Sequence, residues 1–115
     1  MSERLTRAEK LSRRSEFQRC YRHGRRRHGA YATLFTTPAA TDHARIGITA
    51  TRKVGSAVMR NRLKRRVREI YRRWSGRTEL ASVDLVVHLK PAAAQASFAE
   101  LNEDLSKLWS TLIRS

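Results

Sequence analysis

Between Gly55 and Gly76 the sequence places an apolar residue at every third or fourth position and contains no residue that breaks a helix. At about 100° per residue these side chains fall in one narrow stripe, which suits packing against a sheet. Ser56 stands where an N-cap is expected. The segment therefore predicts a helix from Ser56 to about Trp74, whose buried stripe consists of Met59, Leu63, Val67, Ile70 and Trp74.

The opposite side of this predicted helix is strongly basic, and no acid lies on its central stripe. Residues 52–77 hold eleven Lys or Arg against the single acid Glu69. Like charges on neighbouring turns repel by roughly a few tenths of a kcal/mol per pair, so a bound anion explains the stripe better than solvation alone. Arg suits bidentate phosphate contacts. Few groups here could read bases, which favours recognition of a folded RNA through the shape of its backbone. The basic side comprises Asn61, Arg65, Arg68 and Arg72, flanked by Arg60, Arg62 and Lys64.

The rest of the composition agrees with a polyanionic partner. The chain has 115 residues and a net charge of +15, from 25 Lys plus Arg and 10 Asp plus Glu. This length accommodates one domain and excludes a two-domain enzyme. No apolar run could span a bilayer and the N-terminus lacks a secretory pattern, so we expect a cytoplasmic location. The single Cys20 has no disulfide or zinc pattern and is expected to be a small buried hydrophobe.

The remaining segments predict an α+β sandwich of helices over a small sheet. A first helix is expected over residues 12–23, with Gly24 as a left-handed residue at its C-terminus. Residues 31–37 and 44–51 alternate like two strands that pair in a hairpin, and residues 24–28 are a further strand candidate. Residues 83–89 predict another strand, with Val83, Leu85, Val87 and Leu89 on one face.

A last helix is expected to begin at Ser97, because Ser97 and Glu100 match a capping box. Its helical spacing predicts a core face, with Trp109 also in the core. The core face is Phe98, Leu101, Leu105, Leu108 and Leu112. Its acids are expected to form a solvated face, made of Glu100, Glu103 and Asp104.

Aromatic residues form a second candidate site. Phe17 and Tyr21 lie four residues apart and share a helix face, while Phe35 is expected on a strand face with Tyr31 and Thr33. These rings could simply pack in the core. Since basic residues flank the helical pair, they could equally line a groove for single-stranded nucleic acid, with rings for stacking and cations for the backbone. The flanking residues are Arg13, Arg14, Arg19 and Arg22.

Residues 52–69, RKVGSAVMRNRLKRRVRE, closely resemble the signature of the bacterial ribonuclease P protein subunit. The spacing of Arg60-Asn61-Arg62, Lys64-Arg65 and Arg68 resembles that family's basic helix, although Ser56 replaces a common Asn. The likeness extends from Leu11–Gly24 to Lys90-Pro91-Ala92 and covers about residues 8–113. The first seven residues lie outside it and are expected to form a flexible basic arm.

The resemblance implies an αβββαβα domain, similar to one seen in ribosomal proteins, with a left-handed βαβ crossover. It implies a protein that joins a large catalytic RNA and promotes removal of the 5′ leader from precursor tRNA. Magnesium ions held mainly by the RNA would supply the chemistry, so no catalytic or metal-binding residue is expected in the protein. No membrane and no obligate protein partner are implied.

The resemblance also implies roles for individual residues. A first set would contact the catalytic RNA: Lys53, Arg60, Asn61, Arg62, Lys64, Arg65, Arg68 and Arg72. A second set would bind the precursor leader: Arg14, Phe17, Tyr21, Phe35 and Lys90.

Three other functions fit parts of the pattern. A structural RNA-binding protein such as a ribosomal component would share the charge but need no leader groove. A DNA-binding regulator would prefer duplex DNA, although the segments flanking the basic helix read as strands. A peripheral membrane protein would expose the apolar stripe to lipid, whereas a domain this small needs that stripe for its core. The absence of paired carboxylates or clustered histidines makes nuclease activity of the isolated protein unexpected.

Overall fold

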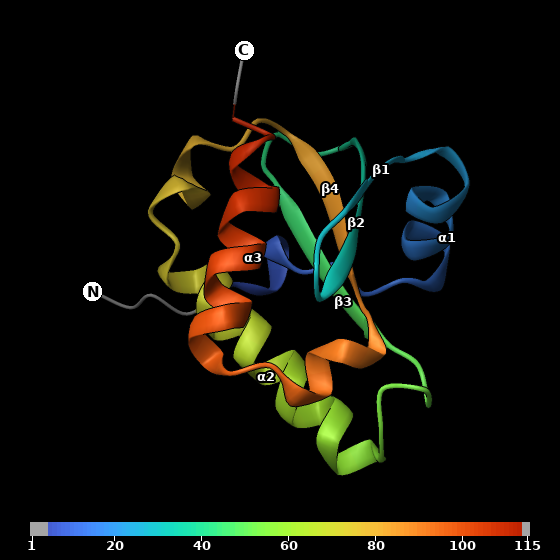
Figure 1. The fold of residues 1–115 in the computed structure, drawn as a ribbon. Helices are drawn as coiled ribbons and strands as arrows, with labels where there is room; N and C mark the ends of the chain where they lie inside the picture. The colour runs from blue at the N-terminus through green and yellow to red at the C-terminus, as the bar shows by residue number, and fades with distance from the viewer. Residues whose placement is uncertain (1–4, 114–115) are drawn as a thin grey trace.

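The computed structural model describes residues 5–113, which form three helices, three short 3-10 turns and four strands (Figure 1). The helices are α1 (Arg14–His23), α2 (Ala57–Arg73) and α3 (Phe98–Ser110). The strands are β1 (Arg25–His28), β2 (Ala32–Pro38), β3 (Arg45–Ala50) and β4 (Val83–Leu89). The 3-10 turns are η1 (Arg7–Glu9), η2 (Ser75–Glu79) and η3 (Pro91–Gln95). The predicted α+β class and the order αβββαβα are confirmed.

The strands lie in one sheet in the order β1-β2-β4-β3. The predicted hairpin between the second and third strands is therefore wrong, because β4 lies between them, antiparallel to β2 and parallel to β3. Alternation shows which side chains face a core but not which strand is the neighbour. β4 takes an inner position because it is apolar on both faces, with Leu85 and Val87 on one side and Val86 on the other, all buried.

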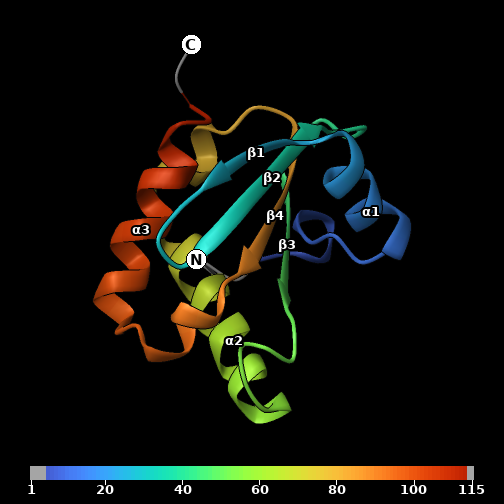
Figure 2. The same ribbon diagram turned by 45° about the vertical axis from the view of Figure 1, so that its right-hand side comes forward.

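The main core lies between the sheet and two helices, α2 and α3 (Figure 2). The predicted stripe of α2 packs here, with Leu63, Val67 and Ile70 at most 2% exposed. Tyr71, which the stripe omitted, is also buried, and its ring meets that of Trp109 at 5.2 Å between centroids. α2 and α3 thus use one face of the sheet and present their outer sides to solvent.

α1 covers the other face of the sheet and forms a smaller cluster there (Figure 2). Its centre is Leu11, Cys20 and Val86, which confirms the buried position predicted for Cys20. Burial also raises the pKa of the Cys20 thiol. The smaller cluster leaves room beside it for half-buried aromatic rings.

Gly24 does not adopt the predicted left-handed conformation, because its φ is −77°. A Cβ there would lie 2.3 Å from the carbonyl oxygen of Cys20 and 2.9 Å from that of Thr36. Glycine is therefore needed for close backbone approach, where α1 turns directly into β1. The further strand candidate at residues 24–28 is confirmed as β1.

Two predictions for α3 are wrong. Phe98 is 45% exposed, because it is the first residue of the helix and lies at the edge of the packed layer. Asp104 is not simply solvated, since its carboxylate accepts hydrogen bonds of 3.0 Å from the backbone N–H groups of Ala30 and Tyr31. The predicted capping box of Ser97 and Glu100 is confirmed.

The N-terminal segment runs beside β3. Lys10 pairs with Ile46 in an isolated parallel bridge, and the Leu11 N–H donates to the Ile46 carbonyl at 2.9 Å. Residues 1–4 of the predicted arm lie outside the described residues. Within the described part, Leu5 packs against the main core and Arg7 begins η1.

Candidate nucleic-acid interface

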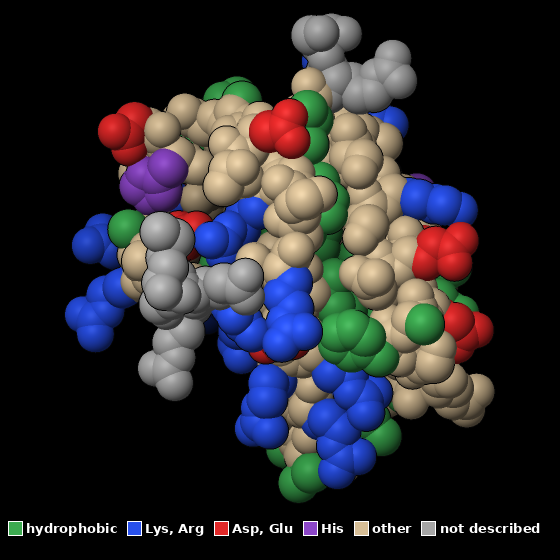
Figure 3. Space-filling view, turned by 90° about the vertical axis from the view of Figure 1, so that its left-hand side faces the viewer, with side chains coloured by type: hydrophobic (Ala, Val, Ile, Leu, Met, Phe, Trp, Pro, Cys, Tyr) green, Lys and Arg blue, Asp and Glu red, His purple; other side chains and the backbone are tan. Residues whose placement is uncertain are grey.

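The outer face of α2 carries the basic side predicted from the sequence. The N-cap is confirmed, as the Ser56 hydroxyl accepts a hydrogen bond from the Met59 N–H at 3.2 Å. With the helix fixed by its buried stripe, the cations turn outward, and Lys and Arg gather over the lower part of this face (Figure 3). Asn61, Arg62, Arg65 and Arg68 are exposed, whereas Arg60, Lys64 and Arg72 are partly buried. We name these seven residues the basic face.

The single acid of the segment, Glu69, lies beside the predicted basic stripe. Glu69 lies one turn before Arg72 and Arg73 and forms ion pairs with both, the second at 2.6 Å. Arg72 therefore brings less net charge to the face than the pattern implied. Lys53 lies outside the helix, exposed in the turn between β3 and α2. The strongest positive field is expected over the first three turns of α2, from Arg60 to Arg68.

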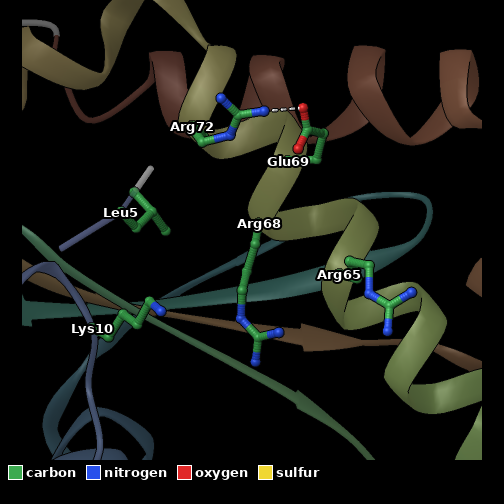
Figure 4. Close-up of a pocket in the computed structure, with 6 residues that line it drawn as sticks. All are labelled: Leu5, Lys10, Arg65, Arg68, Glu69 and Arg72. Atoms are coloured by element: carbon green, nitrogen blue, oxygen red, sulfur yellow. Dashed lines mark hydrogen bonds and ion pairs between the residues drawn. The ribbon is translucent and has the colours of Figure 1, made fainter. Parts of the chain in front are cut away.

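A hollow of about 270 Å³ lies between α2 and the N-terminal segment. Lys10 and Arg68 point into it from opposite sides, and Leu5 lies at its edge (Figure 4). Sequence reasoning missed Lys10, because only the bridge to β3 brings that residue opposite α2. The hollow gives the basic face a concave part in which a phosphate could meet several cations at once.

The second candidate site is a set of aromatic side chains between α1 and the sheet, where the sequence predicted a groove. Its aromatic members are Phe17 and Tyr21 from α1 and Phe35 from β2, and all three are half-buried. Tyr21 and Phe35 meet edge to face, with centroids 4.8 Å apart and an angle of 83°. A Cβ on Gly47 would lie 2.4 Å from the Phe17 ring, so that ring lies directly on the β3 backbone. We call this set the aromatic groove. The structure thus brings together the three rings predicted to share a site.

His88 and Thr49 complete the floor of the aromatic groove. The Tyr21 hydroxyl and the Thr49 hydroxyl share a hydrogen bond of 2.7 Å, and Thr49 is 2.8 Å from His88 Nδ1. The His88 ring forms T-shaped pairs with the rings of Tyr21 and Phe35, with centroids 6.0 and 6.4 Å apart. Burial lowers the pKa of His88, so the imidazole is neutral near pH 7. Sequence reasoning missed both residues, because only the observed strand order brings β3 and β4 beneath α1.

A partly buried ion-pair network holds α1 against the sheet. Arg45 donates to both oxygens of Asp84, at 2.8 and 2.7 Å, and to Glu16 on α1 at 2.7 Å. Asp84 is only 1% exposed. Hydrogen bonds to Asp84 raise the pKa of Arg45 further, so the guanidinium stays charged. The network fixes the wall of the aromatic groove relative to its floor.

Arg14 and Lys90 are the other two residues predicted to bind the leader. Arg14 is exposed at the first position of α1, on the same helix side as Phe17 and Tyr21. The Lys90 ammonium donates to the Gly29 carbonyl at 2.6 Å, so one of its three N–H groups is engaged by the protein. Tyr31 packs against the main core instead of sharing a face with Phe35, which corrects that prediction.

The comparisons with known proteins agree with one another. The family model "Ribonuclease P" matches residues 5–113. A ribonuclease P protein component from Syntrophus aciditrophicus is 33% identical over 90% of this chain and 87% of that protein. One from Desulfovibrio desulfuricans is 43% identical over 81% of this chain and 72% of that protein. The solved ribonuclease P protein of Thermotoga maritima superposes with a TM-score of 0.76, at 30% identity, covering 93% of this chain and 97% of that one.

The chain belongs to the bacterial ribonuclease P protein family. The family supplies the protein component of the ribonuclease P ribonucleoprotein, which removes the 5′ leaders of tRNA, and membership implies association with ribonuclease P RNA. The match begins at Leu5, three residues before the start of the resemblance seen in the sequence. Residues 5–7, which the resemblance left out, are therefore covered by the family match as well.

Two further findings concern residues 5–113 of this family member. No three His, Cys, Asp or Glu side chains in this range are grouped so that they could hold a metal ion. None of the helices described there is long and apolar enough to cross a membrane.

Proposed function

We propose that the basic face of α2 binds ribonuclease P RNA through its phosphate backbone. Four of its members, Asn61, Arg62, Arg65 and Arg68, are exposed, and Lys10 faces Arg68 across the hollow. Lys53 extends the same surface beyond the N-terminus of the helix. Such a surface suits RNA that is recognised by shape, because it offers many phosphate donors and few groups that read bases.

The aromatic groove binds the 5′ leader of precursor tRNA. Leader nucleotides are single-stranded, so their bases can stack on half-buried rings, and Arg14 and Lys90 provide cations at the borders. The observation that carries the proposal is the separation of the two surfaces: rings lie under α1, and a dense set of cations lies on α2, across the sheet. A structural RNA-binding protein would need only the second surface.

The protein positions its substrate and leaves the hydrolysis to the RNA. The acids nearest the groove are already engaged, since Glu16 and Asp84 bind Arg45. Among residues 5–113 they are not grouped with a third possible metal ligand. In the proposed complex the magnesium is held mainly by the RNA. The protein's contribution is binding energy and orientation for the leader, together with cations that lower repulsion between the two RNAs.

Cleavage of a precursor tRNA at low magnesium tests this proposal. Three samples are assayed: a bacterial ribonuclease P RNA alone, the same RNA with the protein, and the protein alone. We expect the protein to stimulate 5′ cleavage by the RNA and to have no activity by itself. Tight binding of the RNA without any stimulation would contradict the proposal and favour a purely structural RNA-binding role.

A further inference from the structure

β1 is an edge strand made only of Arg25, Arg26, Arg27 and His28, all exposed. Its register pairs Arg26 with Phe35, whereas Arg27 lies opposite Leu34 of the main core. Directly opposed residues of an antiparallel pair project from the same face of a sheet. Arg26 therefore stands on the side of the aromatic groove, and Arg27 stands on the side of α3.

Arg26 lies against the ring at the β1 side of the groove. Its guanidinium carbon is 5.5 Å from the centroid of Phe35, which is the distance of a cation–π contact. Tyr21 and His88 meet Phe35 edge to face, so the ring is held in place. Among residues 5–113 no carboxylate pairs with Arg26. A planar cation with unused N–H donors thus borders the groove on a fixed ring.

A common role for charges on an edge strand is to hinder pairing with another sheet. That role would be served equally by either face of the strand. It does not explain why Arg26 is stacked on a ring of the groove. The two faces of β1 thus offer an internal comparison, because Arg26 and Arg27 carry the same charge, lie on the same strand and are both exposed.

We propose that Arg26 is a leader-binding residue that extends the aromatic groove across β1. Its guanidinium, backed by Phe35, stacks on a leader base and donates to the adjoining phosphate. This inference rests on the proposed leader groove and extends the leader-binding surface to β1. β1 and β3 are the two edges of the sheet, about 14 Å apart at three strand spacings.

The position of Arg26 determines which nucleotides it contacts. α2 begins just after β3 and carries the face that binds the catalytic RNA. Leader nucleotides near Phe17, whose ring lies against Gly47 of β3, are therefore closer to that RNA and to the cleaved bond. Nucleotides at Arg26 are farther from it, and only a longer leader reaches them.

The test uses holoenzyme reconstituted with a bacterial ribonuclease P RNA and two precursor tRNAs, one with a single-nucleotide leader and one with a long unstructured leader. We expect Arg26→Ala to weaken binding of the long-leader precursor by about fivefold and to leave the short-leader precursor unchanged. Arg26→Lys keeps the charge but not the planar group, so it should recover only part of the loss. Arg27→Ala is the matched control and should leave the ratio between the two precursors unchanged.

Each outcome decides one of the two proposals. Equal losses with Arg26→Ala and Arg27→Ala would show a general effect of charge and would overturn the role of Arg26. If Phe17→Ala weakens precursor binding and Arg26→Ala does not, the groove stands and its extension is refuted. If Phe17→Ala leaves precursor binding unchanged as well, the leader groove itself fails. For each variant, a midpoint of thermal unfolding equal to that of the wild type verifies that the loss of binding does not come from unfolding.

Discussion

The basic face and the aromatic groove are built in opposite ways. The basic face consists of long side chains that project from one helix, and most of them need nothing from the rest of the protein except the buried stripe beneath. The aromatic groove draws on α1 and three strands, and its rings are fixed by each other, by Gly47 and by the Tyr21–Thr49–His88 hydrogen bonds. The basic face thus depends on which residues one helix carries, whereas the aromatic groove depends on how several elements pack together.

This difference has a physical consequence for binding. Phosphate contacts on the basic face act over several ångströms, add up and weaken with salt, so no single residue dominates. Stacking in the groove depends on ring position, so one misplaced atom can remove it. Substitutions should therefore affect the two surfaces separately, and four predictions test whether they do.

The largest effect is expected from Asp84→Ala. Removing this buried carboxylate takes away two of the three hydrogen bonds described for Arg45 and leaves the one to Glu16, and breaking a buried pair costs about 3–5 kcal/mol. Unfolding in urea measures the loss. At a temperature where the variant is folded, leader binding should fall more than binding of ribonuclease P RNA. Glu103→Ala breaks only the exposed pair with Lys107 and should cost less than about 1 kcal/mol; similar costs for both would contradict the role given to the network.

The next effect is expected from Phe17→Ala. Loss of a stacking ring should weaken binding of precursor tRNA by about 1–3 kcal/mol and leave mature tRNA unaffected. Equilibrium binding of both RNAs to the holoenzyme measures the difference. Phe98→Ala removes an equally large ring that is exposed on α3 and should change neither affinity. Equal losses on precursor and mature tRNA would rule out a leader groove at Phe17.

A smaller effect is expected from Arg68→Ala or Arg65→Ala on the basic face. Each should lower affinity for ribonuclease P RNA and reduce the slope of log affinity against log salt by about 0.7–0.9, the value of one phosphate contact. A titration over several salt concentrations gives the slope. Lys107→Ala removes the same charge from α3 and should leave the slope unchanged. An unchanged slope in a folded Arg68→Ala variant would remove that residue from the interface.

The smallest effect is expected from pH and concerns His88. Burial lowers its pKa from 6.5, so below that pH the unfolded chain takes up a proton more readily than the folded one. The contribution of His88 to stability is therefore present above about pH 6.5 and is lost as the pH falls. Unfolding free energies at about pH 7.5 and about pH 5.5 should differ less in His88→Gln than in the wild type.

His43 provides the control for this measurement, because its pKa is shifted the other way. A hydrogen bond with Asp42, and another with the Ala8 carbonyl, raise the pKa of His43 above 6.5. Its contribution is present at low pH and is lost as the pH rises. His43→Gln should therefore enlarge the loss of stability on acidification. The same response in both variants would contradict the buried position of His88.

Sequence reasoning predicted the two regions unequally, for the same physical reason. The basic face follows from local periodicity, since a stripe of Leu63, Val67 and Ile70 fixes where every other side chain of α2 points. The helical half of the groove followed similarly from the spacing of Phe17 and Tyr21. Its floor did not, because β4 pairs with β2 and β3 across large sequence separations that alternation does not encode.

Individual residues show what kind of information was missing. His88 and Thr49 are ordinary strand residues until β3 and β4 are placed side by side. Lys10 gains its position from a single bridge, and Asp104 from two backbone N–H groups far away in sequence. Gly24 was predicted to be a left-handed residue, whereas the structure needs glycine there for a close backbone approach. The handedness of the crossover came only from the family resemblance.

The central claim is that the basic face contacts ribonuclease P RNA and the aromatic groove contacts the precursor leader. Its most direct test is site-specific cross-linking in the assembled complex with precursor tRNA. Cys20 is fully buried, so a cysteine introduced by Arg14→Cys at the groove or by Asn61→Cys on the basic face is the reactive one for a short photo-cross-linker. The position at residue 14 should cross-link to the 5′ leader and the position at residue 61 to ribonuclease P RNA. Cross-links from both positions to the same RNA, or from residue 14 to mature tRNA as readily as to precursor, would contradict this account.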